Sequence, residues 1–218
     1  MTVNPLLNFN LYIFDLDGTL VDSLGQIEDS LNFARKQHSL PKAPTGLVFQ
    51  NLGLPVHHLF SDLDISHYQE RMLIRVFRVN LLAAILRENL LFPDANALLE
   101  FLKKEKKEIA IATGKTSEMA KSVVKNSKLH TNVDFVQGTD EFPAKPDPEV
   151  IRRCLNHFST LNAVMVGDRT EDILAAQNAG IPAIGIAQSA HKIDDLLGAG
   201  ALTAFPTLAA FFSRLSGE

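Results

Sequence analysis

The sequence predicts an α/β protein, with a Rossmann-like parallel sheet, helices on both faces and an inserted α-helical cap domain. From about residue 108 onward, short apolar runs alternate with amphipathic ones, as strands and helices alternate around a parallel sheet. Residues 22–90 break this alternation, with few β-branched runs and apolar residues at helical spacing. The expected core domain comprises residues 1–21 and 91–218, and the expected cap comprises residues 22–90.

The first elements follow directly from local patterns. The apolar run 11–14 reads as a buried strand that leads into a loop at Gly18. A helix is expected over 23–37, and Pro41, Pro44 and Pro55 break the stretch that follows. A second helix is expected from about 67 to 89. Its apolar stripe is expected to pack in the core of the helical insert, and comprises Met72, Val76, Val79, Leu82, Ile85 and Leu86.

The remaining elements alternate. Asp94 is a candidate cap for a helix through residue 102, and Asp147 caps the helix 148–157, where Pro148 suits the first turn. Gly180 ends the helix that starts at Thr170. Strands are expected at 108–113, 133–136, 163–166, 182–186 and 201–204, and the other helices at 117–126 and 208–215.

Net charge, cysteine count and hydrophobicity limit the kinds of partner and the cellular location that can be expected. The chain has 218 residues and a formal net charge of -4, so it lacks the basic excess typical of nucleic-acid-binding proteins. Its single cysteine, Cys154, excludes an intrachain disulfide and is expected to be a small buried residue. Residues 1–10 do not resemble a signal peptide, and residues 79–86 are too short to span a membrane. We expect a cytoplasmic monomer or homodimer.

The most informative segment is Asp15-Leu16-Asp17-Gly18-Thr19, at the end of the first strand. Charges in this place are costly unless they are compensated. A divalent cation would compensate them, and a metal beside a carboxylate indicates chemistry on a phosphate.

Three further segments follow strands and are expected to converge on the same edge of the sheet, where ligands bind in such folds. These segments are 113–115, 144–147 and 167–172. One carboxylate can attack phosphorus, and another can protonate the leaving oxygen. Mg²⁺ can screen the repulsion between anions, and hydroxyl, amide and lysine groups can bind phosphate oxygens. Gly167 is expected to let the backbone turn before Asp168.

These four segments resemble the four motifs of the haloacid dehalogenase superfamily, in the same order, and residues 22–90 resemble its helical cap. The resemblance implies that Asp15 is the nucleophile and Asp17 the general acid/base. It also implies that Mg²⁺ is held by Asp15, by Asp17 through its backbone carbonyl, and by Asp168. Asp172 and Thr19 would support these groups.

The resemblance further implies that Thr113 and the Gly114 amide bind phosphate and that Lys145 anchors its charge. The segments 111–116 and 143–148 are similar to those of the phosphoglycolate phosphatase-like group. One departure is that Gly114 stands where the second motif commonly has Asn, so Lys115 is the candidate for that substrate contact. The role of Arg169 is left open, and Gly53-Leu54-Pro55 falls at the expected specificity loop.

The sequence thus predicts a Mg²⁺-dependent phosphatase that hydrolyses a small phosphorylated metabolite, such as phosphoglycolate, through an aspartyl-phosphate. A haloacid dehalogenase would need no metal and usually lacks the second aspartate, so Asp17 and Asp168 argue against it. A sugar-phosphate mutase of the same superfamily and a non-catalytic binding protein with this fold remain as alternatives.

Overall fold

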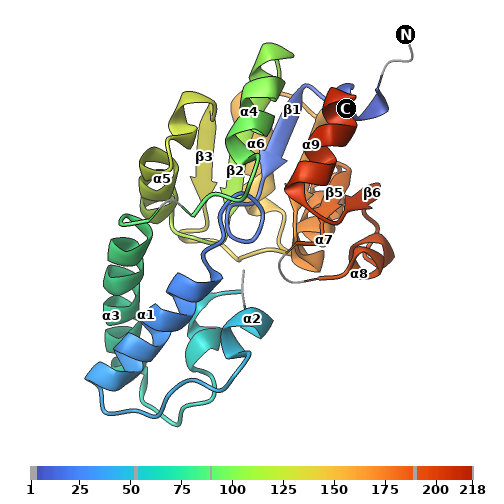
Figure 1. Cartoon of the computed structure of the whole chain (residues 1–218). Helices are drawn as coiled ribbons and strands as arrows, with labels where there is room; N and C mark the ends of the chain where they lie inside the picture. Colours follow the sequence, from blue (N-terminus) through green and yellow to red (C-terminus); the bar gives the residue numbers. More distant parts are fainter. Residues whose placement is uncertain (1–3, 52–53, 89, 189–190, 218) are drawn as a thin grey trace.

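The computed structural model describes residues 4–51, 54–88, 90–188 and 191–217 (Figure 1). Within these residues, six parallel strands form one sheet in the order β3-β2-β1-β4-β5-β6. The strands are β1 (Leu11–Phe14), β2 (Glu108–Thr113), β3 (Phe135–Gly138), β4 (Ala163–Gly167), β5 (Ala183–Ile186) and β6 (Thr203–Phe205).

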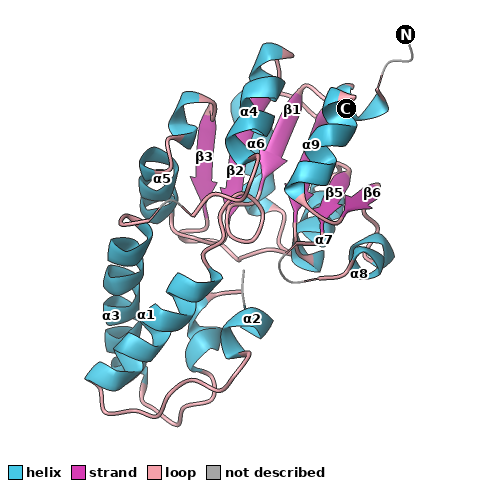
Figure 2. Ribbon diagram, viewed as in Figure 1, coloured by secondary structure: helices cyan, strands magenta, loops and turns pink. Residues whose placement is uncertain are grey.

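Helices cover both faces of this sheet (Figure 2). Tyr12 and Phe14 of β1 face one side, against α4 (Ala95–Lys104), α5 (Ser117–Asn126) and α9 (Leu208–Ser216). Leu11 and Ile13 face the other side, against α6 (Glu149–Phe158), α7 (Thr170–Ala179) and α8 (Ile193–Gly198). Adjacent side chains of a strand point to opposite faces, so this burial on both sides explains the continuous apolar run. The predicted parallel sheet with helices on both faces is confirmed.

Residues between β1 and α4 form a helical segment beyond the carboxyl ends of the strands. It contains α1 (Leu24–Gln37), α2 (Leu47–Asn51), the 3₁₀ helix η2 (Val56–Phe60) and α3 (His67–Ile85). In Figure 1 the arrowheads of β1 and β3 point toward this segment. Two adjacent connections join it to the sheet, because Val21 pairs with Leu91 and the Asp22 amide donates to the Leu90 carbonyl at 2.7 Å. The division into core and cap domains stays a prediction.

The helix α3 differs from the prediction in its end and in its buried face. It ends at Ile85, since the chain must turn back to pair Leu91 with Val21; Asn89, the expected end, lies outside the described residues. The expected core stripe is also partly wrong, because Val79 is 66% exposed and Leu86 is 42% exposed. Packing against α1 selects a neighbouring row, which comprises Leu73, Phe77, Leu81 and Ile85.

Other boundaries move by a few residues. β3 starts at Phe135, since the Val133 amide still bonds back to Leu129 in the preceding 3₁₀ turn, η3 (Leu129–Thr131). β6 starts at Thr203, and α2, η2, η3, α8 and η1 (Pro5–Leu7) were not predicted. Asp147 accepts a bond from the Glu149 amide, as expected of a cap. Asp94 makes no such bond, because it adopts a left-handed conformation.

Two further expectations concern membrane-spanning helices and the role of the single cysteine. Among the described residues, no helix combines the length and the apolar character that crossing a membrane requires. Cys154 is fully buried, and this burial raises the pKa of its thiol to about 12, so it behaves as a small apolar residue.

Candidate active site

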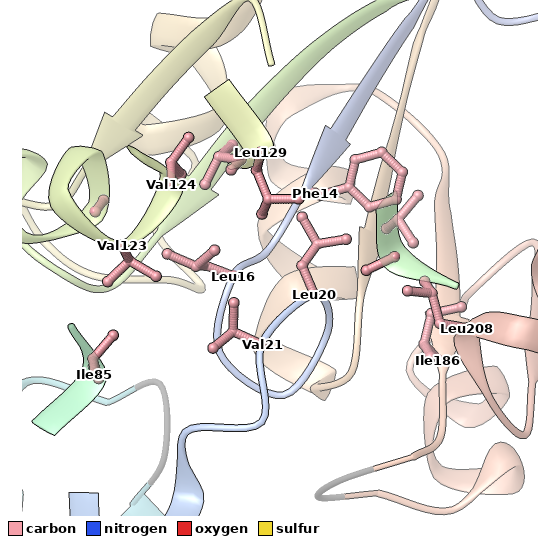
Figure 3. Packing of buried hydrophobic residues seen from close by; sticks show 14 of the residues in the cluster. Phe14, Leu16, Leu20, Val21, Ile85, Val123, Val124, Leu129, Ile186 and Leu208 are labelled. Carbon is pink, nitrogen blue, oxygen red and sulfur yellow. The ribbon is translucent and has the colours of Figure 1, made fainter. Parts of the chain in front are cut away.

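The loop after β1 is fixed by apolar side chains on both sides of its acidic residues. Leu16, Leu20 and Val21 have no exposed surface. Figure 3 shows them projecting from the loop, between Val123 and Val124 on one side and Ile186 and Leu208 on the other. This packing leaves the carboxylates of Asp15 and Asp17 directed to the cavity beyond the strand ends. A buried loop anchored in this way holds its functional groups with little freedom to reorient.

Lys145 lies at the centre of the charged groups. Its Nζ is 2.6 Å from Asp15 Oδ1 and 2.5 Å from Asp172 Oδ1, and it donates to the Ala112 carbonyl at 3.2 Å. The lysine side chain is 4% exposed. Three acceptors, from the loop after β1, from β2 and from α7, therefore match the three protons of the ammonium group.

A buried carboxylate cluster lies around this lysine. Asp15, Asp168 and Asp172 each offer an oxygen, and these oxygens lie within 4.8 Å of one another. The Thr19 hydroxyl donates to Asp168 Oδ1 at 3.0 Å. Because Mg²⁺ prefers carboxylate oxygens and three carboxylates cluster beside the single ammonium group of Lys145, this donor set fits a divalent cation.

The contacts of Asp172 favour a supporting role over a metal ligand. One of its oxygens binds Lys145, and the other accepts the Arg169 amide at 3.1 Å. Asp15 and Asp168 are then the side chains best placed to hold a cation. Asp17 is not in the cluster of side-chain oxygens, so its side chain is not placed as a ligand. The resemblance expected Asp17 to contribute its backbone carbonyl instead.

Gly167 provides the space for Asp172. A Cβ atom at this position would lie 2.4 Å from the Oδ2 atom of Asp172. Gly167 is the last residue of β4 and is not among the residues with a positive φ. The expectation that it eases a turn before Asp168 is therefore wrong, because the glycine admits a buried carboxylate next to the strand.

Asp17 has a separate set of partners. Lys115 Nζ lies 2.7 Å from its Oδ2 atom, and the Ser23 hydroxyl donates to its Oδ1 atom. The Lys115 amide donates to the Thr113 hydroxyl oxygen at 3.3 Å. Lys115 therefore faces the site, as predicted, but in this structure it binds the second aspartate.

The pKa values of Asp15 and Lys145 are shifted by burial and by the neighbouring charges. Removal from water, together with Asp172 and Asp17, raises the pKa of Asp15 to about 7, although Lys145 opposes the shift. Burial would lower the pKa of Lys145, but the carboxylates of Asp15 and Asp172 outweigh it and raise that pKa above its ordinary value. Lys145 stays protonated, and excess negative charge gathers at Asp15, where a cation would offset it.

A cavity of about 110 Å³ opens above these groups. Its floor consists of the carboxylates and the loop after β2, namely Asp15, Asp17, Thr113, Gly114 and Lys115. Its upper walls come from the helical segment. Of the expected specificity loop, Leu54 lines the cavity, whereas Gly53 lies outside the described residues.

The structure brings together every site residue that the sequence singled out, and it adds two that the sequence missed. Gln188 donates to the Gly18 and Thr19 carbonyls, and Ser23 contacts Asp17. Neither residue lies in a recognisable pattern; Ser23 starts a helix, where serine usually serves as a cap. Arg169, left open by the sequence, joins the core to the helical segment by donating to the Phe49 carbonyl at 3.4 Å.

Comparison with known proteins gives the same picture. A model of the haloacid dehalogenase-like hydrolase family matches residues 12–186. Probable phosphatase IndB of Dickeya dadantii is 32% identical over 197 residues, covering 85% of this chain and 84% of that protein. A phosphoglycolate phosphatase of Mannheimia succiniciproducens is 30% identical, with 82% and 85% covered.

A solved structure agrees over nearly the whole length. The haloacid dehalogenase-like family hydrolase from Streptococcus pneumoniae superposes with a TM-score of 0.82 at 26% identity, covering 94% of this chain and 99% of that one. The resemblance to the phosphoglycolate phosphatase-like group is confirmed by the relatives of that name. The chain belongs to the haloacid dehalogenase-like hydrolase family.

Proposed function

We propose that the protein is a Mg²⁺-dependent phosphatase that hydrolyses a small phosphate monoester through an aspartyl-phosphate on Asp15. The observation that carries this proposal is the buried cluster of Asp15, Lys145 and Asp168 at the base of a cavity whose floor includes Asp15. Its family membership and its relatives named as phosphatases support the same reaction class.

In the first half-reaction, a carboxylate oxygen of Asp15 attacks phosphorus and the ester P–O bond breaks. Asp17 gives a proton to the leaving oxygen, and the alcohol departs. The Thr113 hydroxyl and the Gly114 amide bind the phosphoryl oxygens, and the positive charge of Lys145 beside Asp15 stabilises the negative charge that grows on them in the transition state.

In the second half-reaction, Asp17 takes a proton from water, whose oxygen attacks phosphorus. The bond to Asp15 breaks, inorganic phosphate forms, and both aspartates regain their starting states. Mg²⁺, held by Asp15, Asp168 and the Asp17 carbonyl, would screen the repulsion between the nucleophile and the phosphate. Thr19 and Asp172 keep Asp168 and Lys145 in position. The helical segment would act as the cap that excludes bulk water.

The test is hydrolysis of a generic aryl phosphate with Mg²⁺, with a chelator, and by Asp15→Asn. We expect the chelator and the substitution each to remove activity by at least about a thousandfold, because each deletes a group that contacts the reacting phosphate. Asp147→Asn is a control that makes the same chemical change, since the Asp147 carboxylate accepts the Glu149 amide at the start of α6 and is not among the described residues that line the cavity. Turnover that survives both losses contradicts the proposal, and an absolute requirement for a bisphosphate would favour the mutase.

A further inference from the structure

The upper part of the cavity is lined mainly by apolar side chains. Five buried side chains of the helical segment line it, and each is at most 6% exposed: Ile27, Val48, Leu59, Phe77 and Leu81. Val56, which is half-buried, completes this wall. The wall therefore offers contact area for a substrate but few groups that could pair with a charge.

Among the described residues, the charged side chains that line the cavity either form ion pairs within the protein or are exposed to solvent. Lys115 is bound to Asp17 at 2.7 Å, and Asp15 to Lys145 at 2.6 Å. The other cation in the lining, Arg78, is solvent-exposed. A substrate carboxylate inside the apolar wall would lose its hydration without a buried cation in return, which is costly.

We infer that the organic part of the substrate is a small, uncharged apolar group, attached to the phosphate that the floor binds. The cavity has a volume of about 110 Å³, floor included, and it is open on one side, so a small apolar group can lie against the wall and extend toward the opening. The inference rests on the proposed phosphatase function, and it disfavours phosphoglycolate, whose organic part is a carboxylate.

Turnover provides the first test. Benzyl phosphate and phosphoglycolate are both esters of primary alcohols, and they differ mainly in the apolar or anionic character of the organic group. Burying one ring contributes about 1.5–3 kcal/mol, so kcat/KM should favour benzyl phosphate by about ten- to a hundredfold. A preference for phosphoglycolate that Arg78→Leu abolishes would overturn the inference and assign Arg78 to a substrate carboxylate.

Binding provides a second test that does not depend on turnover. Calorimetric titration with benzylphosphonate and phosphonoacetate, in buffer with Mg²⁺, should show tighter binding of benzylphosphonate. Val56→Thr places a hydroxyl in the wall and should weaken that binding about tenfold. Val76→Thr makes the same change at a half-buried position on α3 outside the lining, and should leave it unchanged.

The two tests separate the two claims. If benzylphosphonate binds and responds to Val56→Thr while no phosphate ester is hydrolysed, the phosphatase proposal fails and the apolar subsite stands. If esters are hydrolysed but the two phosphonates bind equally, or Val56→Thr and Val76→Thr act alike, the subsite inference is wrong and the phosphatase proposal stands.

Discussion

Lys145 keeps its place because Asp172 is held behind it, and Asp172 fits only because position 167 has no side chain. The carboxylate of Asp172 is 2% exposed and has a partner for each oxygen. Such supporting contacts commonly change activity strongly while leaving the groups that touch the substrate intact. The position of Lys145 beside Asp15, the proposed nucleophile, thus depends on Asp172, to which we assign only a supporting role.

Gly167→Ala tests this dependence. The new Cβ would overlap Asp172 at 2.4 Å, so the carboxylate must move and release Lys145. We expect kcat for an aryl phosphate to fall by about ten- to a hundredfold. The control is Gly25→Ala in α1, where a Cβ meets no atom within 4 Å; this substitution should preserve kcat and slightly raise stability.

Steady-state kinetics and thermal unfolding of both variants decide the outcome. If Gly167→Ala retains full kcat, the claim that Asp172 positions Lys145 is contradicted. A loss of activity that comes only with a loss of folded protein would equally contradict it, since the overlap would then disturb the strand rather than the site.

At the level of elements, the buried guanidinium group of Arg35 connects several parts of the helical segment by hydrogen bonds. Arg35 of α1 is fully buried, and its guanidinium group donates to both oxygens of Asp62 and to the Leu59 carbonyl at 3.1 Å. Asp62 lies between η2 and α3, so three parts of the segment meet at this group. The hydrogen bonds from Arg35 are the largest influence on Asp62 and lower the pKa of its carboxyl.

Asp62→Asn should therefore destabilise the protein in a pH-dependent way. The folded-state pKa of Asp62 lies below its unfolded value, so its stabilisation is fully present above about pH 4 and is lost as the pH falls through the folded value. We expect the substitution to cost about 2 kcal/mol at neutral pH. Urea unfolding should show that cost shrinking as the pH is lowered from about 7 toward about 3.

The matched control is Asp64→Asn, two residues further along the same loop. Asp64 is exposed and is in no ion pair with Arg35, so its substitution should change the free energy of unfolding little at any pH. A cost for Asp62→Asn that does not vary with pH would show that packing, rather than the charge of Asp62, stabilises this junction.

An element could be predicted well from the sequence when its apolar pattern was compatible with only one structure. The four inner strands of the sheet, β2, β1, β4 and β5, are buried on both faces, and a continuous apolar run such as 109–112 predicts only a buried strand. By contrast, α3 is apolar on more than one face, and contact with α1 decides which row is buried. The periodicity of α3 alone cannot show which apolar row is buried, because contact with α1, a different part of the chain, determines it.

At the scale of the whole molecule, the sheet topology explains why the site could be predicted. Parallel strands put their carboxyl ends on one edge, so four segments spread over more than 150 positions of the sequence meet around Lys145. The partners of those segments could not be predicted in the same way. Gly167, Ser23 and Gln188 contribute through tertiary packing, and the sequence carries no local sign of it.

The same limit applies to specificity. The apolar residues of the helical segment look like ordinary core residues in the sequence, and most of the buried ones are. Only the folded arrangement shows that several of them line a cavity whose floor is the acidic loop. The proposed chemistry could therefore be inferred from four short motifs, whereas the proposed substrate surface, assembled from α1, α2, η2 and α3, could not.

The most direct test of the account is to trap the covalent intermediate. The enzyme is mixed with Mg²⁺ and substrate, quenched in acid within one turnover, and digested for mass spectrometry. We expect a phosphoryl group on the peptide that contains Asp15, and none on the corresponding peptide of Asp15→Asn. A phosphoryl group on another residue, or steady turnover with none on Asp15 at any quench time, would contradict it.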